Sequence, residues 1–201
     1  MNPTHYIHSA NKKRWEAASA GWARGADNRG TWRRCLREPE LVLSTMELKY
    51  LAGISGKRVC VLGSGDNQVV FALAGLGAAV TSVDISKNQL QVAEMRSREL
   101  DLSIAFVQAD VTDLSVLAGG SFDAVYTGGH VAVWVADLPK YYMEAARILM
   151  PSGLLMISEY HPFRRIWKES KDSLIVQSKY FNRGPFEYNF TEDVLARSRV
   201  R

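Results

Sequence analysis

The chain has little cysteine and no long apolar run, and each shortage excludes a class of protein. Only two of its 201 residues are cysteines, which are too few for a disulfide framework. The longest apolar run, residues 69–80, is broken by glycine and too short to span a bilayer. Residues 1–11 lack the apolar core of a signal peptide. We therefore expect one globular domain, with 47% hydrophobic residues, in the cytoplasm.

The chain also lacks a concentrated basic stripe, although its net charge is +4. Residues 1–50 carry nine basic and five acidic side chains, as do residues 161–201, whereas residues 51–160 carry seven and eleven. In both flanks the basic residues stand among aromatic and acidic ones. Nucleic-acid-binding proteins usually concentrate their basic residues on one face. We interpret these flanks as solvated surfaces and do not expect a nucleic-acid partner.

The most informative stretch is a glycine-rich turn at residues 59–67. A short apolar run ends at Gly63 and Gly65, and residues 68–76 are compatible with a helix, which predicts a strand, a tight turn and a helix N-terminus. Glycine suits such a turn because it permits a positive φ and a close approach by a ligand. Asp84 ends the next apolar run, where a parallel sheet binds ribose hydroxyls. The glycine turn and Asp84 together favour a binding site for a nucleoside-containing ligand. The alternative is a purely structural turn followed by a surface aspartate.

The N-terminal residues predict two helices. Residues 11–24 place Trp15 and Trp22 on one face of a helix. These tryptophans either simply dock the helix on the domain or make it close the ligand site. Pro39 starts a further helix that ends near Leu51, since proline is tolerated in the first turn.

The middle of the chain alternates between strand and helix. The expected strands are residues 58–62, 80–84, 104–108, 122–127 and 154–158. The expected helices are residues 68–75, a helix capped by Ser86 and running to about 100, a short one at 113–117, and 138–150. This alternation predicts an α/β fold with a Rossmann-like, doubly wound, mostly parallel sheet. Ligands of such sheets bind at the carboxyl ends of the strands.

Five motifs in this part of the chain resemble those of the class I S-adenosylmethionine-dependent methyltransferases, of the bacterial small-molecule type. They are Val-Leu-Gly-Ser-Gly-Asp-Asn (61–67), Ser-Val-Asp-Ile-Ser (82–86), Val-Gln-Ala-Asp-Val (107–111), Phe-Asp-Ala-Val-Tyr (122–126) and Ala-Arg-Ile-Leu-Met-Pro-Ser-Gly-Leu-Leu (146–155). Their order and spacing cover about residues 55–162. The resemblance implies S-adenosyl-L-methionine as cofactor and an oxygen, nitrogen or carbon atom of a small molecule as methyl acceptor.

The resemblance also implies which residues bind the cofactor. Asp84 and Gln89 would hold the ribose, Asp110 would accept from the adenine amine, and Gly128 would border the sulfonium. Ile85 would pack on the adenine. The full implied set is Gly63, Ser64, Gly65, Asn67, Asp84, Ile85, Gln89, Asp110, Val111 and Gly128.

A catalytic base is optional in this family, because a sulfonium methyl is already activated and the protein mainly aligns the acceptor with it. Where an acceptor needs deprotonation, histidine is the side chain best suited to the task near neutral pH. His130 and His161 follow the fourth and fifth predicted strands and are candidate bases, or alternatively structural residues. Neither is paired with another ligand at metal-binding spacing, so we expect no metal site.

Three departures from the family pattern are visible. Val61 and Asn67 stand where the family has an acidic residue and a third glycine, and Asp66 is a candidate to compensate for the missing acid. About forty residues follow His161, so the last strands of the fold are shortened or missing. We expect residues 173–190 to cover the edge of the fifth strand, from the same chain or from a second protomer in a homodimer.

Two other functions stay open at this point. One is a truncated methyltransferase-like domain that binds cofactor or a partner without turnover. The other is an NAD(P)-dependent oxidoreductase, although Gln68 stands where the dinucleotide fingerprint has its third glycine. We divide the single domain into an N-terminal helical cap (1–52), a cofactor-binding α/β core (53–162) and a C-terminal segment (163–201).

Overall fold

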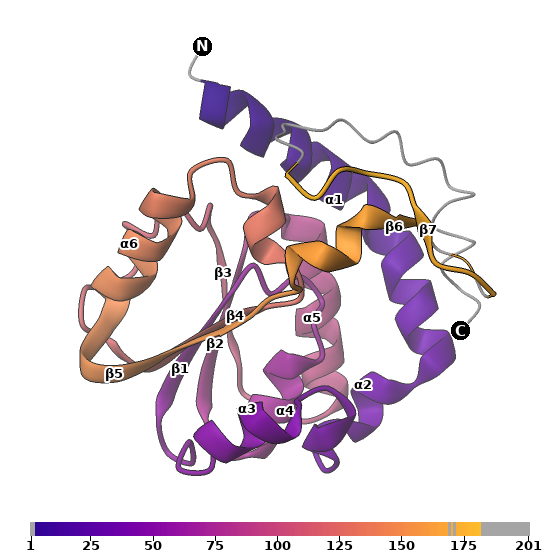
Figure 1. The fold of residues 1–201 in the computed structure, drawn as a ribbon. Helices are drawn as coiled ribbons and strands as arrows, with labels where there is room; N and C mark the ends of the chain where they lie inside the picture. The colour runs from indigo at the N-terminus through magenta and orange to yellow at the C-terminus, as the bar shows by residue number, and fades with distance from the viewer. Residues whose placement is uncertain (1–2, 169, 171, 182–201) are drawn as a thin grey trace.

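A five-stranded parallel sheet forms the centre of the molecule (Figure 1). The structure is a computed structural model that describes residues 3–168, 170 and 172–181. The strand order is β3-β2-β1-β4-β5, which reverses direction between β1 and β4. The strands are β1 (Arg58–Leu62), β2 (Ala79–Asp84), β3 (Ala105–Gln108), β4 (Phe122–Gly128) and β5 (Leu149–Ser158). The predicted doubly wound α/β fold is confirmed, and such a reversal is where these sheets bind ligands.

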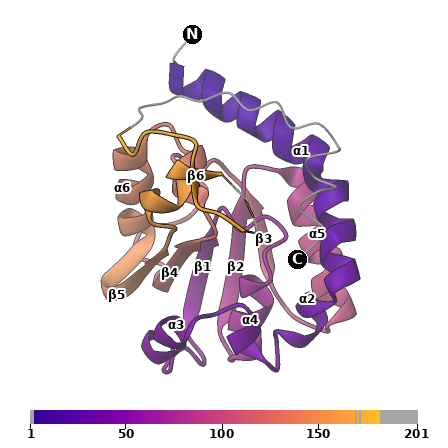
Figure 2. The same cartoon turned by 45° about the vertical axis from the view of Figure 1, so that its right-hand side comes forward.

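Helices cover both faces of the sheet (Figure 2). The first face carries α1 (Pro3–Arg29), α2 (Thr31–Arg34), α3 (Thr45–Tyr50), α4 (Val69–Gly75) and α5 (Lys87–Glu99); the second carries α6 (Leu138–Ile148). Val59 and Val61 of β1 belong to the first core, and Cys60 and Leu62 belong to the second. After the exposed Arg58 this strand is apolar, because both of its faces are buried. Within the described part of the chain, no helix is long and apolar enough to cross a membrane.

The N-terminal helices differ from the prediction in length and number. The first helix, α1, extends well beyond residues 11–24 at both ends. The single helix expected from Pro39 to Leu51 is wrong, because a 3₁₀ helix, η1 (Pro39–Leu41), is followed by a break and then by α3. The break arises because Ser44 and Glu47 form a capping box, which starts a new helix.

The helix expected at residues 113–117 is also wrong, since this stretch consists of turns. Asp110 and Asp113 form an isolated bridge there. The Leu114 amide donates to Glu144 of α6 over 2.8 Å. Because a side chain of α6 satisfies this amide, the segment stays bonded without a helix.

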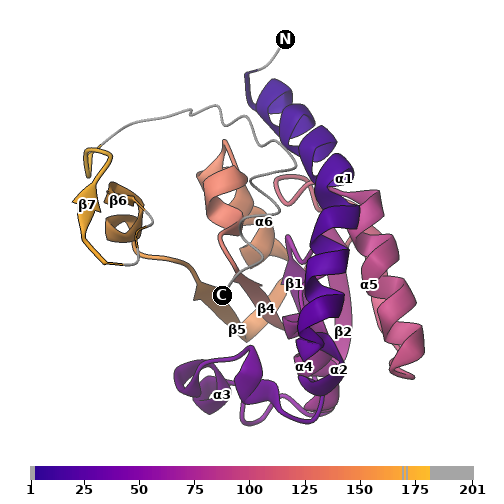
Figure 3. The same cartoon turned by 90° about the vertical axis from the view of Figure 1, so that its right-hand side faces the viewer.

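At the other end of the sheet, β5 is an edge strand, and the described residues after it form a separate hairpin (Figure 3). A 3₁₀ helix, η3 (Pro162–Ile166), leads to β6 (Trp167–Lys168), which pairs antiparallel with β7 (Ile175–Val176). The expected cover of β5 by residues 173–190 is therefore wrong as far as residue 181, because β7 pairs with β6 instead. Residues 182–190 lie outside the described part. Cover by a second protomer stays a prediction.

Candidate functional site

A cavity of about 350 Å³ opens at the carboxyl ends of β1, β2 and β3, against α1. It collects residues from separate strands and loops, as the reversal of strand order predicts. All ten residues that the sequence motifs implied line it: Gly63, Ser64, Gly65, Asn67, Asp84, Ile85, Gln89, Asp110, Val111 and Gly128. The motifs therefore converge on one site.

The glycine-rich turn brings the backbone close to this cavity. Gly63 and Gly65 have φ values of 61° and 52°, which other residues rarely adopt. A Cβ on Gly63 would lie 2.6 Å from both methyl groups of Val131, so a larger residue does not fit. A Cβ on Gly65 would point at Gln89 Oε1 and Asp84 Oδ2, at 3.8 and 3.9 Å. The missing side chain keeps open the space in front of these two polar groups.

Two polar side chains of the turn form hydrogen bonds to the adjacent strand and helix. Asn67 stands where a third glycine was expected, and its Oδ1 accepts from the Val69 amide over 3.0 Å at the start of α4. Ser64 Oγ lies 2.7 Å from Ser82 Oγ and donates to the Val83 carbonyl over 3.1 Å. The turn is thus fixed to β2 and to α4.

Arg96 of α5 holds the same turn from behind. Its side chain is buried, and Nη1 donates to Asp66 Oδ2 over 2.7 Å. Nη2 donates to the Ala23 carbonyl and to Asp27 Oδ1 of α1, over 2.9 and 3.0 Å. Val61, which replaces the acid of the family pattern, is buried in the apolar core. In this chain the turn is instead tied to α5 and α1 through the Asp66–Arg96 ion pair.

Asp84 is a buried carboxylate at the tip of β2, with 8% of its surface exposed. Oδ2 accepts from the Gly65 amide and Oδ1 from the Ser86 amide, both over 2.7 Å. Burial raises the pKa of this carboxyl to about 6, although the two backbone hydrogen bonds act in the opposite direction. Each carboxylate oxygen has two lone pairs, so each has a further acceptor position. Two such positions suit a vicinal pair of hydroxyls.

Gln89 has a buried carbonyl oxygen in the same wall. Oε1 has no hydrogen-bond partner among the described residues, and the side chain is almost fully buried. An unpaired buried acceptor costs about 1–3 kcal/mol. A ligand hydroxyl or amine in the cavity would remove this penalty.

Asp110, at the end of β3, is bound by two neighbours. Its Oδ1 accepts from the amide and the hydroxyl of Thr112 over 2.9 and 2.8 Å, and Oδ2 lies 2.6 Å from Nδ1 of His8. Burial acts to raise the pKa of Asp110, but the hydrogen bonds from His8 and Thr112 lower it to about 2. Asp110 is therefore an anion at neutral pH.

The wall opposite the glycine turn comes from α1, and the sequence prediction missed part of it. Trp15 and Trp22 line the cavity, and closure of the site by this helix stays a prediction. His8 and Asn11 line it as well, and Asn11 donates to the Trp134 carbonyl over 2.8 Å. On the helix face that carries Trp15 and Trp22, Asn11 lies one helical turn before Trp15 and His8 lies two turns before it. Extending that face toward the N-terminus would have found them.

A second cavity, of about 370 Å³, lies beside the first at the carboxyl ends of β4 and β5. The two cavities share Trp22, Asp66, Asn67 and Gly129 as lining residues. This common wall means that a molecule in the second cavity would lie next to one in the first.

Polar groups line this second cavity. The Tyr126 hydroxyl donates to Glu47 Oε1 over 2.7 Å. Burial, and then the Glu47 carboxylate, raise the pKa of Tyr126, so its hydroxyl stays protonated. Glu159 accepts from the Ala132 amide over 3.1 Å.

The two candidate bases occupy different positions. His130 lines the second cavity, with its ring against Tyr160 and its backbone at φ 74°. His161 lines neither cavity; its Nδ1 accepts from the Phe163 amide at the start of η3. The structure thus brings His130, but not His161, to the second cavity.

Comparison with known proteins agrees with this geometry. Residues 60–157 match the profile of the methyltransferase domain family. Ubiquinone biosynthesis O-methyltransferases are among the curated relatives of the chain. Over residues 60–157 the chain belongs to the methyltransferase domain family. S-adenosyl-L-methionine is the cofactor of this family.

The similarity to individual methyltransferases is partial. The ubiquinone biosynthesis O-methyltransferase of Alkalilimnicola ehrlichii is 29% identical over 156 residues, which are 76% of this chain and 60% of the relative. That of Xanthomonas campestris pv. campestris is 32% identical over 125 residues, 61% of this chain and 52% of the relative. The chain therefore spans between half and three fifths of these relatives. A methyltransferase structure from Aquifex aeolicus has a TM-score of 0.54 at 15% identity and covers 70% of both chains, which shows the shared fold.

Proposed function

We propose that this chain is an S-adenosylmethionine-dependent methyltransferase that acts on an oxygen, nitrogen or carbon atom of a small molecule. The observation that supports this most directly is the pair of buried acceptors in front of Gly65. Gln89 Oε1 has no partner among the described residues, and Asp84 has two further acceptor positions. A ribose presents hydroxyl donors that match this arrangement.

The other residues of the first cavity fit the remaining parts of the cofactor. Asp110 is an anion that can accept from the amino group of adenine, with Ile85 and Val111 as apolar neighbours. Gly63 and Gly65 let the methionine portion approach the backbone. When bound, the cofactor supplies a methyl group on a positively charged sulfur, already activated for transfer.

The acceptor site that we propose is the second cavity. Its common wall with the first cavity would place an acceptor beside the cofactor's methionine portion. The chain would then catalyse transfer by aligning the acceptor with the methyl group. His130 is the candidate base for an acceptor that must lose a proton. The first acceptors to test carry a hydroxyl group, because the curated relatives are named O-methyltransferases.

We further propose a cytoplasmic location, which the two buried, unpaired cysteines support. The homodimer stays a proposal that light scattering on the full chain will test. Nucleic acid is not proposed as a partner.

Titration calorimetry with S-adenosylmethionine and, separately, with NADH tests the cofactor. We expect binding of the first and none of the second; the reverse result would favour an oxidoreductase. The purified chain is then incubated with a metabolite extract and cofactor carrying an isotopically labelled methyl group. A labelled product seen by mass spectrometry supports turnover. Binding without any labelled product would favour the non-catalytic alternative.

A further inference from the structure

The carboxylate of Asp110 has only one acceptor position left. A carboxylate offers about four lone-pair positions. On Oδ1, the amide and the hydroxyl of Thr112 take both. On Oδ2, Nδ1 of His8 takes one, at 2.6 Å. The remaining acceptor position is on Oδ2, the oxygen that also bonds to His8.

The second contact of His8 determines which of its ring nitrogens donates. The Ala136 amide donates to Nε2 over 2.9 Å, so Nε2 carries no proton. The ring proton therefore lies on Nδ1 and is donated to Asp110. The imidazole is also buried, with 7% of the residue exposed. It projects from α1 and is held between Asp110 and Ala136, which follows the 3₁₀ helix η2 (Val131–Trp134). Its geometry sets the direction of the one lone pair that Asp110 has left.

We propose that His8 is a positioning residue for base recognition, acting through Asp110 to make the site select a 6-aminopurine. The proposal rests on the proposed function. With His8 in place, Oδ2 faces the cavity as a pure acceptor, which favours the amino group of adenine and repels the 6-oxo group of hypoxanthine. Without His8, the carboxylate turns more freely and this selection weakens.

Two substitutions of His8 separate this role from general support. His8→Leu removes both hydrogen bonds and fills a similar volume. His8→Asn keeps an amide nitrogen at the same number of bonds from Cα as Nδ1, so it preserves a donor toward Asp110. Glu16→Ala is the matched control, because Glu16 also ties α1 to the domain, through the Lys87 amide over 2.8 Å, but does not line the cavity.

The experiment compares S-adenosylhomocysteine with S-inosylhomocysteine by titration calorimetry at neutral pH, and the readout is the ratio of their dissociation constants. The natural chain should prefer the adenine ligand. His8→Leu should lower this preference about tenfold, the value of one hydrogen bond to a charged group. His8→Asn should restore most of the preference, and Glu16→Ala should leave the ratio unchanged.

Other outcomes distinguish the two proposals. If the natural chain binds neither nucleoside, the proposed function fails. If His8→Leu weakens both ligands equally, or if Glu16→Ala changes the ratio as much, His8 only docks the helix and the positioning role is overturned. Thermal melting of each variant checks that the chains compared are folded.

Discussion

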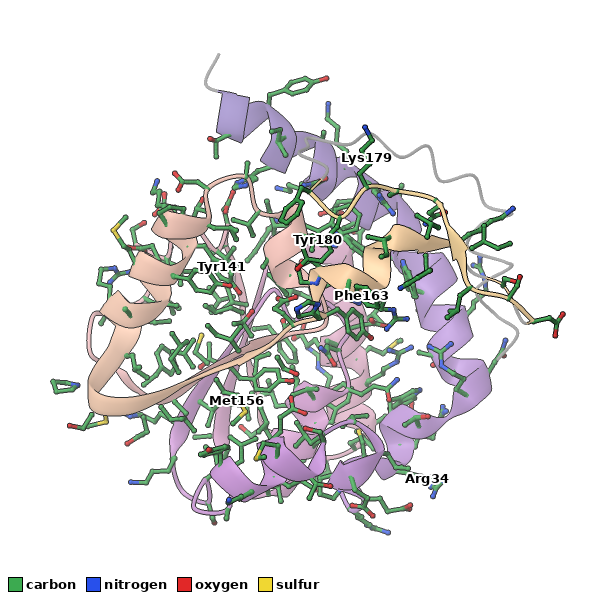
Figure 4. The ribbon with its side chains drawn as sticks, in the orientation of Figure 1. Arg34, Tyr141, Met156, Phe163, Lys179 and Tyr180 are labelled. Carbon is green, nitrogen blue, oxygen red and sulfur yellow. The ribbon has the colours of Figure 1, made fainter. Side chains whose placement is uncertain are left out.

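The cofactor side of the sheet and its β5 side are packed very differently. At the tip of β2, Asp84 is 8% exposed and bonded through both carboxylate oxygens, whereas Leu174, in the hairpin after β5, is 82% exposed. Figure 4 shows where the looser packing begins: Tyr141 of α6 and Met156 of β5 are still buried in the core, whereas Phe163 and Tyr180, on the segment after β5, are about half exposed. The carboxyl end of β2 is thus held by mutual contacts, whereas the segment after β5 is largely exposed.

The largest effect should come from Arg96→Met, which removes the cation that joins the glycine turn to α1. Breaking a buried ion pair by removing one partner is strongly destabilising, and we expect the free energy of unfolding to fall by about 3 kcal/mol. Urea denaturation measures this. The control is Arg98→Met on the same helix, whose pair with Glu94 is exposed and should be worth less than about 1 kcal/mol. Equal losses in the two variants would contradict the role of Arg96 as the buried link between the glycine turn and α1.

Next in size is the effect of Asp84→Ala on cofactor binding. Loss of the carboxylate removes the acceptors for both ribose hydroxyls and releases the Gly65 amide. We expect S-adenosylmethionine to bind roughly tenfold to a few hundredfold more weakly. Asp123→Ala is a suitable comparison, since that carboxylate bonds Arg58 at the start of β1, the opposite end of the strand. Unchanged affinity in Asp84→Ala, with normal melting, would remove Asp84 from the site.

A smaller effect should appear when the pH is lowered. The contribution of Asp84 to folding stability should rise, whereas the affinity for the cofactor should fall. Burial raises the pKa of Asp84 to about 6 in the folded chain, above the unfolded value of about 3.9. Between these values the folded chain binds the extra proton, so this group makes folding more favourable as the pH falls. Cofactor binding needs the carboxylate and should weaken over the same range.

The matched variant for this test is Asp84→Asn, which does not titrate. Two differences between this variant and the natural chain should each follow a single ionisation near pH 6. One is the difference in the dissociation constant of S-adenosylhomocysteine, from calorimetry, and the other is the difference in the free energy of unfolding, from urea denaturation. A difference that stays flat from pH 5 to about pH 7.5 would show that Asp84 keeps an ordinary pKa.

The smallest effect is expected for Leu174→Ser in the hairpin after β5. This side chain is 82% exposed, so the free energy of unfolding should change by no more than about 0.5 kcal/mol. Cofactor affinity should not change. A loss above about 1 kcal/mol in urea denaturation would mean that the hairpin packs against another surface in solution.

The cofactor side could be predicted from the sequence because its signals are local. Gly63, Gly65 and Asp84 follow directly from apolar strands, and the topology of a parallel sheet brings strand ends together. For His8 the helical stripe of α1 indicates the face on which it lies, but not its partners, which are 102 and 128 residues away. The expected cover of β5 by residues 173–181 of the same chain failed because Ile175 and Val176 pair with the nearby β6, a choice that composition does not reveal.

The long separation between α1 and its partners also governs the order of events during synthesis. His8 leaves the ribosome first, but Ala136, which fixes its imidazole, follows 128 residues later, or roughly 6–25 s at ordinary rates of translation. During that time α5 becomes available to α1, but Trp134, against which Trp15 packs, is still missing. The helix α1 is therefore made before the part of its docking surface around Ala136, and the ligand site is completed only when that later segment exists.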